Sequence, residues 1–254
     1  MSNAYVAGAS YGWRARIGML VPSLPFDTNV HEFYLMAPEG VSLIITWLGV
    51  GGMAQERYDR AIANIAEPLR MVTQRKADVI LQAGVPPLVT RGPGFEAELL
   101  ARVAQLTSVP FITDVGASGR AMKALGLAKV VMLSSTFDDE MARHISVYLE
   151  RAGIGLVGAA QAHIPREVVG TVALEVVYRA ARKLFESHRG NANGIWITQA
   201  SMPSVAVIED LERSLDVPVV TSAQALMWAG LRTVGVREAI AGFGKLFAIE
   251  KLPQ

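Results

Sequence analysis

An internal repeat limits the folds open to this chain more than any other feature of its sequence. The stretch Leu106–Thr113 reads LTSVPFIT, and Ser214–Thr221 echoes it as SLDVPVVT. An apolar run and a small-residue loop precede each copy: DVILQA with Gly84–Pro87 in the first, and GIWIT with Gln199–Pro203 in the second. Repeated units of this kind predict two similar halves that pack about a pseudo-twofold axis.

Short apolar runs rich in β-branched residues alternate with longer amphipathic stretches along the chain. This alternation is typical of βα units, whose strands form a parallel sheet covered by helices. The expected strands lie near Arg16–Val21, Ser42–Leu48, Asp78–Ala83, Pro110–Thr113, Lys129–Leu133, Gly155–Ala160, Gly194–Thr198 and Pro218–Thr221. The sequence therefore predicts an α/β fold of two pseudo-symmetric Rossmann-like halves, each a four-stranded parallel sheet flanked by helices.

The repeat also divides the chain into segments. Residues 1–15 are expected to form an N-terminal extension, residues 16–115 the first half and residues 116–247 the second half. The C-terminal helical stretch 222–247 is expected to pack near the first half, although it follows the second in the sequence. The two halves should then form one compact unit with the active cleft between them.

One cleft between the halves is expected to hold the functional site. Ligands of open α/β sheets bind outside the carboxyl ends of the strands. In this chain the loops at those ends follow Val21, Ala83, Leu133 and Thr198. Because related halves face each other across a pseudo-twofold axis, these loops should line the same cavity.

Composition and charge narrow the class of protein. Hydrophobic residues make up 51% of the 254 residues, which is enough to bury a full core without disulfides or metals. Lys and Arg number 24 against 23 Asp and Glu, and they are scattered, so nucleic acid is not an expected partner. No apolar run approaches the ~18 residues that a membrane span needs, and the first residues lack a hydrophobic signal core. The expected location is the cytoplasm, without membrane contact.

The lack of cysteine restricts the chemistry. The chain contains no cysteine, which excludes disulfides, thiolate metal sites and thiol nucleophiles. Its histidines show no metal-ligand spacing. The glycine-rich stretch Gly49–Gly52 lacks the helix and the acidic residue of a dinucleotide fingerprint. We therefore expect no metal site and no bound dinucleotide.

Several motifs together resemble one enzyme family. They are Val21-Pro22-Ser23, Glu32-Phe33-Tyr34, Ala37-Pro38-Glu39-Gly40-Val41, Gln55–Arg60, Ala77-Asp78-Val79-Ile80, and Pro218–Ala225 with Trp228 and Leu231-Arg232. In this order, from about Arg16 to Phe247, the chain resembles the maleate isomerase and arylmalonate decarboxylase family of the aspartate/glutamate racemase superfamily. The resemblance implies a cofactor-free enzyme of two pseudo-symmetric halves that holds a small carboxylate between them. It also implies a homo-oligomer, with a dimer as the expected form.

The resemblance further implies where the reactive groups stand. Such enzymes carry a cysteine in one loop of each half, on opposite faces of the substrate, although the arylmalonate decarboxylases keep only the second. Matching the flanking motifs places these positions at Gly84 and Gln199, and places a substrate-binding tyrosine at Thr136. Racemisation by two opposed bases is then excluded, because Gly84 has no titratable side chain. Isomerisation of the maleate type lacks the thiol that adds to the double bond.

Decarboxylation asks less of the side chains. A carboxylate held against apolar walls can leave as CO2, provided that donors stabilise the remaining enediolate. Backbone N–H groups of the loops Gly84–Pro87 and Gln199–Pro203 can act as such donors. The first loop offers fewer donors to the enediolate, because its two prolines have no N–H group and Val85 has no hydroxyl group.

A proton must still return to carbon, and the candidate donors are hydroxyl groups or a bound water. We predict Gln199, Thr136 and Ser201 as the catalytic residues, with Gln199 holding the water. The hydroxyl groups have an alternative role as helix N-caps. Ser135 or Thr136 precedes one expected helix, and Ser201 or Ser204 precedes another.

Further residues near these loops are expected to bind the substrate. Thr28 and Asn29 follow the first strand, where the family carries an Asn-Thr contact, although a turn role explains them equally well. Arg166 follows the sixth strand and is suited to pair with a carboxylate, or to remain a solvated loop charge. The predicted substrate-binding residues are Ser23, Thr28, Asn29, Gly84, Val85, Pro86, Ser134, Ser135, Arg166 and Ala200.

Three functions fit these observations. The leading hypothesis is a cofactor-independent lyase of the decarboxylase type, or an isomerase, that acts on a small mono- or dicarboxylate through an enediolate-like intermediate. The alternative is a catalytically degenerate family member that binds a small carboxylate. A third possibility is a tautomerase-type reaction in the same pocket, assisted by Thr136 and Gln199. The fold does not choose among them, because one scaffold hosts many chemistries.

Overall fold

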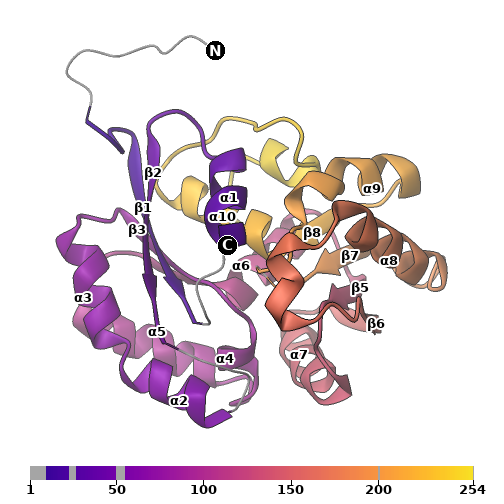
Figure 1. Ribbon diagram of the computed structural model, residues 1–254, viewed down its shortest axis with the longest axis horizontal. Helices are drawn as coiled ribbons and strands as arrows, with labels where there is room; N and C mark the ends of the chain where they lie inside the picture. The colour runs from indigo at the N-terminus through magenta and orange to yellow at the C-terminus, as the bar shows by residue number, and fades with distance from the viewer. Residues whose placement is uncertain (1–9, 23–26, 50–54, 200, 254) are drawn as a thin grey trace.

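Two four-stranded parallel sheets form the framework of the chain (Figure 1). The computed structural model describes residues 10–22, 27–49, 55–199 and 201–253. The first sheet has the strand order β2-β1-β3-β4 and the second β6-β5-β7-β8, with every neighbouring pair parallel. The strands are β1 (Ala15–Val21), β2 (Val41–Trp47), β3 (Val79–Gln82), β4 (Phe111–Thr113), β5 (Lys129–Ser134), β6 (Gly155–Gln161), β7 (Gly194–Ile197) and β8 (Val219–Thr221). The predicted fold of two Rossmann-like halves is confirmed.

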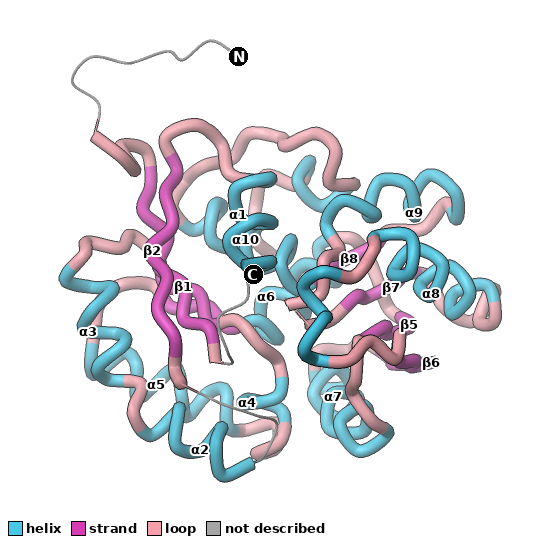
Figure 2. The backbone as a smooth tube through the Cα atoms, viewed as in Figure 1, coloured by secondary structure: helices cyan, strands magenta, loops and turns pink. Residues whose placement is uncertain are grey.

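Helices cover both sheets, as the tube in Figure 2 shows. The α-helices are α1 (Asp27–Met36), α2 (Gln55–Ala63), α3 (Ala66–Gln74), α4 (Pro86–Val89), α5 (Phe95–Leu106), α6 (Asp114–Ala124), α7 (Asp139–Arg151), α8 (Leu174–Glu186), α9 (Ile208–Leu215) and α10 (Ser222–Thr233). Three short 3-10 helices are η1 (Arg166–Thr171), η2 (Val205–Val207) and η3 (Lys245–Ala248). Strands β3 and β7 lie inside their sheets and are buried along their whole length, and their sequences are apolar except for Gln82 at the end of β3.

Helices α6 and α10 lie between the two sheets, where the halves meet (Figure 1). Each follows the last strand of its half, and each begins at a threonine N-cap: Thr113 accepts the N–H of Gly116 and Thr221 accepts the N–H of Gln224, both at 3.1 Å. The two helices pack against each other, while α10 also contacts β3 and β4, and α6 also contacts β8. The repeat therefore joins the halves through helices that each contact both sheets.

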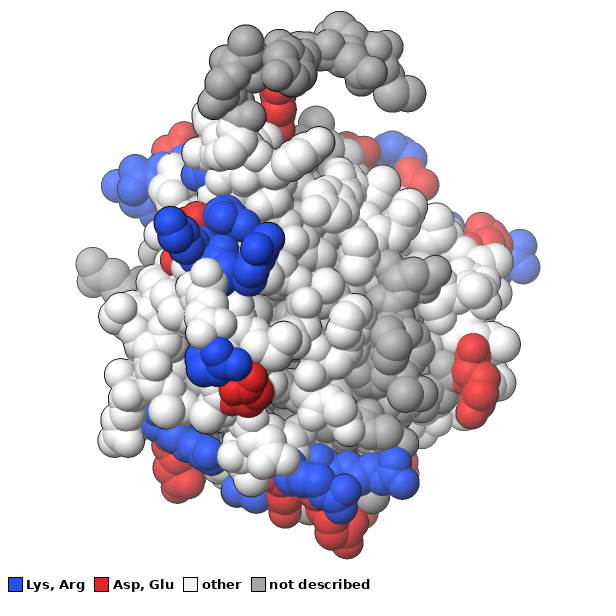
Figure 3. Space-filling view, turned by 60° about the vertical axis from the view of Figure 1, so that its left-hand side comes forward, with Lys and Arg blue, Asp and Glu red and all other residues white. Residues whose placement is uncertain are grey.

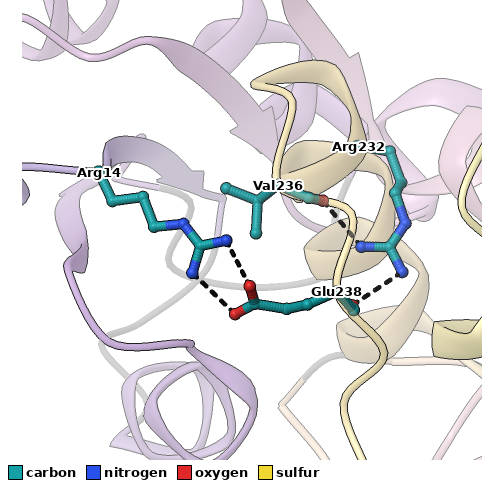
Figure 4. Close-up of polar contacts among 4 residues, drawn as sticks. All are labelled: Arg14, Arg232, Val236 and Glu238. Atoms are coloured by element: carbon teal, nitrogen blue, oxygen red, sulfur yellow. Dashed lines mark hydrogen bonds and ion pairs between the residues drawn. The ribbon is translucent and has the colours of Figure 1, made fainter.

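A C-terminal segment follows α10, and the buried side chain of Arg232 forms several of its hydrogen bonds (Figure 4). The expected helical stretch 222–247 forms an α-helix only to Thr233, because Gly235 adopts a left-handed φ of +82° and ends it. Arg232 then donates to the carbonyl oxygens of Val236 and Phe247, at 2.8 and 2.7 Å. Arg14, ahead of β1, forms a bidentate ion pair with Glu238 of the same segment.

The surface agrees with the scattered charge in the sequence. In Figure 3, basic and acidic side chains lie next to one another along the lower edge of the face in view. Ion pairs between close neighbours on one helix, such as Arg182 with Glu186 at 2.9 Å, also place opposite charges side by side. In the described ranges no helix is both long enough and apolar enough to span a bilayer.

Candidate active site

Two loops occupy equivalent positions at the carboxyl ends of β3 and β7. Gly84 follows β3 and has a φ of +95°, and Gln199 follows β7 and has a φ of +86°. Glycine adopts this left-handed conformation freely, whereas a residue with a side chain is strained by about 1–2 kcal/mol. The shared backbone conformation supports the equivalence of these positions, and it marks Gln199 as a strained residue in a candidate site. We call 84–87 the first loop and 199–203 the second loop.

The second loop brings three predicted residues together. The Gln199 side-chain oxygen accepts hydrogen bonds from the N–H and the hydroxyl group of Ser135, at 3.1 and 2.6 Å. The Ser135 hydroxyl also lies 3.5 Å from the hydroxyl of Thr136, which is exposed. Because its oxygen is already engaged, Gln199 can offer a ligand only its N–H donors. An amide N–H binds an anion but is too weak an acid to protonate carbon.

The N-cap alternative for these hydroxyl groups is wrong at the first of the two helices. Helix α7 is capped by Asp138, whose carboxylate accepts the N–H of Met141 at 2.9 Å. Ser134 instead accepts the N–H of Phe137 at 3.0 Å and closes a turn ahead of the cap. Ser135 and Thr136 are therefore not caps. At the second helix, Ser204 stands at the N-cap position of η2 without a side-chain capping bond.

The first loop is apolar and poor in free N–H groups. The N–H of Gly84 donates to the Asp114 carboxylate at 2.9 Å, and Pro86 begins the short helix α4. Val85 and Pro86 are buried, and both prolines lack an N–H group. Val85 is then the one residue of this loop whose N–H remains for an anion. The loop therefore offers fewer N–H donors to an anion than the sequence alone predicts.

Asp114 is a buried carboxyl group directly behind the first loop. It begins α6 and is completely buried, and Ser118 donates to its other oxygen at 3.3 Å. Burial raises the pKa of Asp114 to about 6, and the neighbouring Ser222 hydroxyl and the Gly84 amide act in the opposite direction. Asp114 was not among the site residues predicted from the sequence. The repeat carried a signal for it, because Asp114 and Ser222 follow the two equivalent threonines.

Glu32 reaches from the first half to the end of the second loop. This glutamate of α1 is 2% exposed, and one of its oxygens accepts the N–H groups of Ser204 and Val205, at 2.5 and 2.9 Å. Burial raises the pKa of Glu32 to about 7, although the two amides lower it. From the sequence, Glu32 was predicted only as part of a family motif. Its contact with Ser204 spans 172 residues and was not predicted.

The remaining predicted residues have varied positions. Thr28 and Asn29 are buried in the first turn of α1, so the proposed turn role is replaced by a helical one. Ser201 is half-buried in a turn closed by the N–H of Met202 and the carbonyl of Gln199 at 2.9 Å. Arg166 begins η1. Ser23 and Ala200 lie outside the described residues. In the part of the chain that the structure describes, no group of three acidic or histidine side chains is arranged to hold a metal.

The positive φ and close surroundings of Gly84 predict that a side chain at this position destabilises the protein. A Cβ atom at this position would lie 2.7 Å from Cγ of Pro22, a rigid ring, so Gly84→Ala adds a clash to the strain of a positive φ. We expect Gly84→Ala to lower the free energy of unfolding by about 2 kcal/mol in urea titrations. Gly92→Ala is the matched control, because Gly92 has a φ of +85° and open space around its Cβ direction. It should cost about 1 kcal/mol, and equal costs for the two variants would refute the clash.

Sequence comparisons find relatives that cover almost the entire chain. The family model described as arylmalonate decarboxylase matches residues 17–247. The chain is 27% identical over 233 residues to the arylmalonate decarboxylase of Bordetella bronchiseptica, which covers 91% of this chain and 95% of the relative. It is 25% identical over 249 residues to the maleate isomerase of Nocardia farcinica, covering 91% and 94%.

Solved structures show the same fold. A glycine-to-cysteine variant of arylmalonate decarboxylase, in a sulfate-associated form, superposes with a TM-score of 0.81 at 24% identity and covers 92% of this chain and 100% of its own. A cysteine-to-serine variant of the Nocardia farcinica maleate cis-trans isomerase, with a covalently bound succinylcysteine intermediate, has a TM-score of 0.81 at 22% identity, covering 92% and 98%. Together with the family match over residues 17–247, these findings show that the chain belongs to the arylmalonate decarboxylase family.

Proposed function

We propose that this chain is a cofactor-independent lyase that removes CO2 from a small malonate-type dicarboxylate through an enediolate-like intermediate. The observation that carries the proposal is the contrast between the two loops. The first loop presents buried Val85 and Pro86 and few N–H donors, whereas the second presents the Gln199 amide beside two hydroxyl groups. One loop suits a departing CO2 group, and the other suits the negative charge that remains.

Decarboxylation needs this kind of asymmetry. The leaving carboxylate loses its charge as CO2 forms, so an apolar wall favours the product over the charged ground state. The electrons of the broken C–C bond move into the retained carboxylate, whose growing charge is stabilised by donors already in place. The N–H groups of Gln199 and the hydroxyl of Thr136 are the candidate donors, with Ser135 holding Gln199 in position.

Isomerisation of the maleate type is the weaker candidate. The maleate isomerase of Nocardia farcinica has been solved with a covalently bound succinylcysteine intermediate, so a cysteine of that enzyme bonds to the substrate. This chain contains no cysteine, and Gln199 cannot replace a thiolate as a nucleophile. Decarboxylation needs no covalent bond between enzyme and substrate.

The test is a screen of the purified protein against α-aryl- and α-alkylmalonates in D2O. We expect release of one CO2 and uptake of one deuterium at the α-carbon, both measured by NMR. Gln199→Ala should lower kcat/KM by about 10- to 100-fold, because it removes a donor to the enediolate. Ser146→Ala, which loses an exposed contact with Glu150 on α7, is the control and should leave turnover unchanged. Full turnover by Gln199→Ala would remove this residue from the site.

A degenerate carboxylate-binding protein is the second candidate. It is favoured by one observation: the loop residues that replace the family thiols, Gly84 and Gln199, carry no acidic group. Titration calorimetry with an unreactive monocarboxylate such as phenylacetate distinguishes the two functions. Binding that Gln199→Ala weakens, together with no CO2 release from any malonate, would support the binding protein and refute the lyase.

A further inference from the structure

The proposed reaction still needs a proton donor. The enediolate must receive a proton at carbon, and neither the Gln199 amide nor the hydroxyl groups of Ser135 and Thr136 are acidic enough to supply it. A general acid has to keep its proton near neutral pH and release it within reach of the cleft. Buried carboxyl groups meet the first requirement, because burial disfavours their charged form.

Most buried or half-buried carboxyl groups between the halves are fully engaged. Asp114 binds Gly84 with one oxygen and Ser118 with the other. Glu96 of α5 accepts the hydroxyl of Thr113 with one oxygen and the hydroxyl of Tyr148 with the other. Within the described ranges, Glu32 is the carboxyl group with a buried oxygen, Oε2, that has no hydrogen-bond partner. Its other oxygen is fixed by the two amides at the end of the second loop.

Thr28 provides a path from Glu32 towards the cleft. Thr28 and Glu32 are four residues apart on α1, so their side chains lie on the same face of the helix, one turn from each other. Thr28 is 4% exposed, and its hydroxyl oxygen is also buried without a partner among the described residues. Because α1 starts after the carboxyl end of β1, Thr28 stands one turn nearer to the expected cleft than Glu32 does.

We propose that Glu32 is the proton reservoir of the site and that the Thr28 hydroxyl, with one water bound between them, relays its proton to the substrate carbon. The proposal rests on the proposed decarboxylase function. A water in this position would satisfy both of the buried oxygens, since a threonine hydroxyl and a water can each donate and accept.

Every proton and electron pair in this step has a source and a destination. Loss of CO2 breaks the C–C bond and leaves its electron pair in the enediolate. The Glu32 carboxylic acid then gives its proton to the water, the water passes a proton to the Thr28 oxygen, and the Thr28 hydroxyl proton forms the new C–H bond. Glu32 is left as a carboxylate that the amides of Ser204 and Val205 stabilise, and it takes up another proton from solvent.

The surroundings of Glu32 suit this role. Its pKa, raised to about 7 by burial, keeps it protonated in much of the neutral range. The ionisable groups on the elements packed around it are His31 and Tyr34 on its own helix and Arg232 on α10, while η2 has none. Burial raises its pKa, and the two amides act in the opposite direction. His31 is exposed, and Arg232 binds backbone carbonyls of the C-terminal segment.

The decisive experiment compares kcat, KM and the pH profile of four variants on a malonate that the wild-type protein turns over. We expect Glu32→Gln to lower kcat about 100-fold, because it keeps an acceptor for the amides but has no acidic proton. Its KM should not change, and it should lose the fall in kcat that the wild type shows as pH rises through about 7. Thr28→Val should lower kcat similarly, and Thr28→Ser should restore it.

Glu96→Gln is the matched control, since Glu96 is a carboxyl group of the first half that binds a residue of the second half, Tyr148. It should keep the wild-type kcat and pH profile. Wild-type kcat in Glu32→Gln, or in Thr28→Val, overturns the relay while the decarboxylase function stands. Should Glu32→Gln fail to fold, the Thr28 pair decides alone. A wild-type protein that releases no CO2 from any malonate overturns the proposed function, and the relay with it.

Discussion

Replacing Arg232 with alanine is expected to lower the free energy of unfolding by about 4 kcal/mol, the largest loss of stability that we predict. The guanidinium group is buried and donates to four backbone carbonyls, those of Val236, Glu238, Phe247 and Ile249. A carbonyl left buried without a donor costs about 1–3 kcal/mol. The Ile249 carbonyl is affected least, because it keeps a hydrogen bond from Trp228 at 3.0 Å.

Urea denaturation followed by circular dichroism measures this loss. Arg237→Ala is the control, because Arg237 lies in the same C-terminal segment but is exposed, and it should change stability by less than about 0.5 kcal/mol. Arg232→Lys should recover only part of the loss, since an ammonium group cannot reach carbonyls that a planar guanidinium group spans. A loss below about 1 kcal/mol for Arg232→Ala would show that other contacts hold the segment.

The C-terminal segment matters to the site because it supports the start of α10. Gln224, in the first turn of this helix, donates to the carbonyl of Phe243 at 2.5 Å and completes the capping box of Thr221. Between these two residues lies Ser222, which acts on the pKa of Asp114 behind the first loop. The start of α10 therefore lies behind the first loop, near the Asp114 carboxylate that accepts the Gly84 N–H. Loss of Arg232 should loosen the first loop along with the C-terminal segment.

The architecture could be predicted from the sequence because it depends on patterns that are repeated. The copies that end at Thr113 and Thr221 fix two equivalent strand–helix units, and both threonines cap their helices as the pattern implies. Their equivalence extends to Gly84 and Gln199, which share a left-handed backbone conformation. Local signals were sufficient here because the apolar pattern and the caps that define each strand and helix lie within that element.

The polar contacts of the site could not be predicted in the same way. Glu32 meets Ser204 across 172 residues, and Gln199 meets Ser135 across 64. Burial of a carboxyl group is a property of the packed molecule, so no local pattern distinguishes Glu32 from an exposed acidic residue. The N-cap prediction failed for a local reason. Ser135, Thr136 and Asp138 are all good caps, and the one at the actual start of α7 takes the role.

The wild-type protein is expected to lose about 3 kcal/mol of stability relative to Glu32→Gln as the pH rises from 4 to 8. The folded-state pKa of Glu32 is raised from 4.5 to about 7, a shift of about 2.5 units at about 1.4 kcal/mol each. Between these values the folded state binds a proton that the unfolded state has released, so stability falls with pH. The contribution is complete below pH 4.5 and is lost as the pH passes 7.

Urea titrations of the two proteins at each pH give the difference directly. Asp114, whose pKa is also raised, is present in both proteins, so its effect cancels in the difference. Glu238→Gln provides a control of opposite sign, because the hydrogen bond from Arg14 lowers the pKa of Glu238 and its contribution disappears as the pH falls. A difference between wild type and Glu32→Gln that stays constant from pH 4 to 8 would show that the pKa of Glu32 in the folded state equals its unfolded value of 4.5. The carboxyl group would then have no proton to give at neutral pH, and the stability measurement would argue against the relay without any substrate.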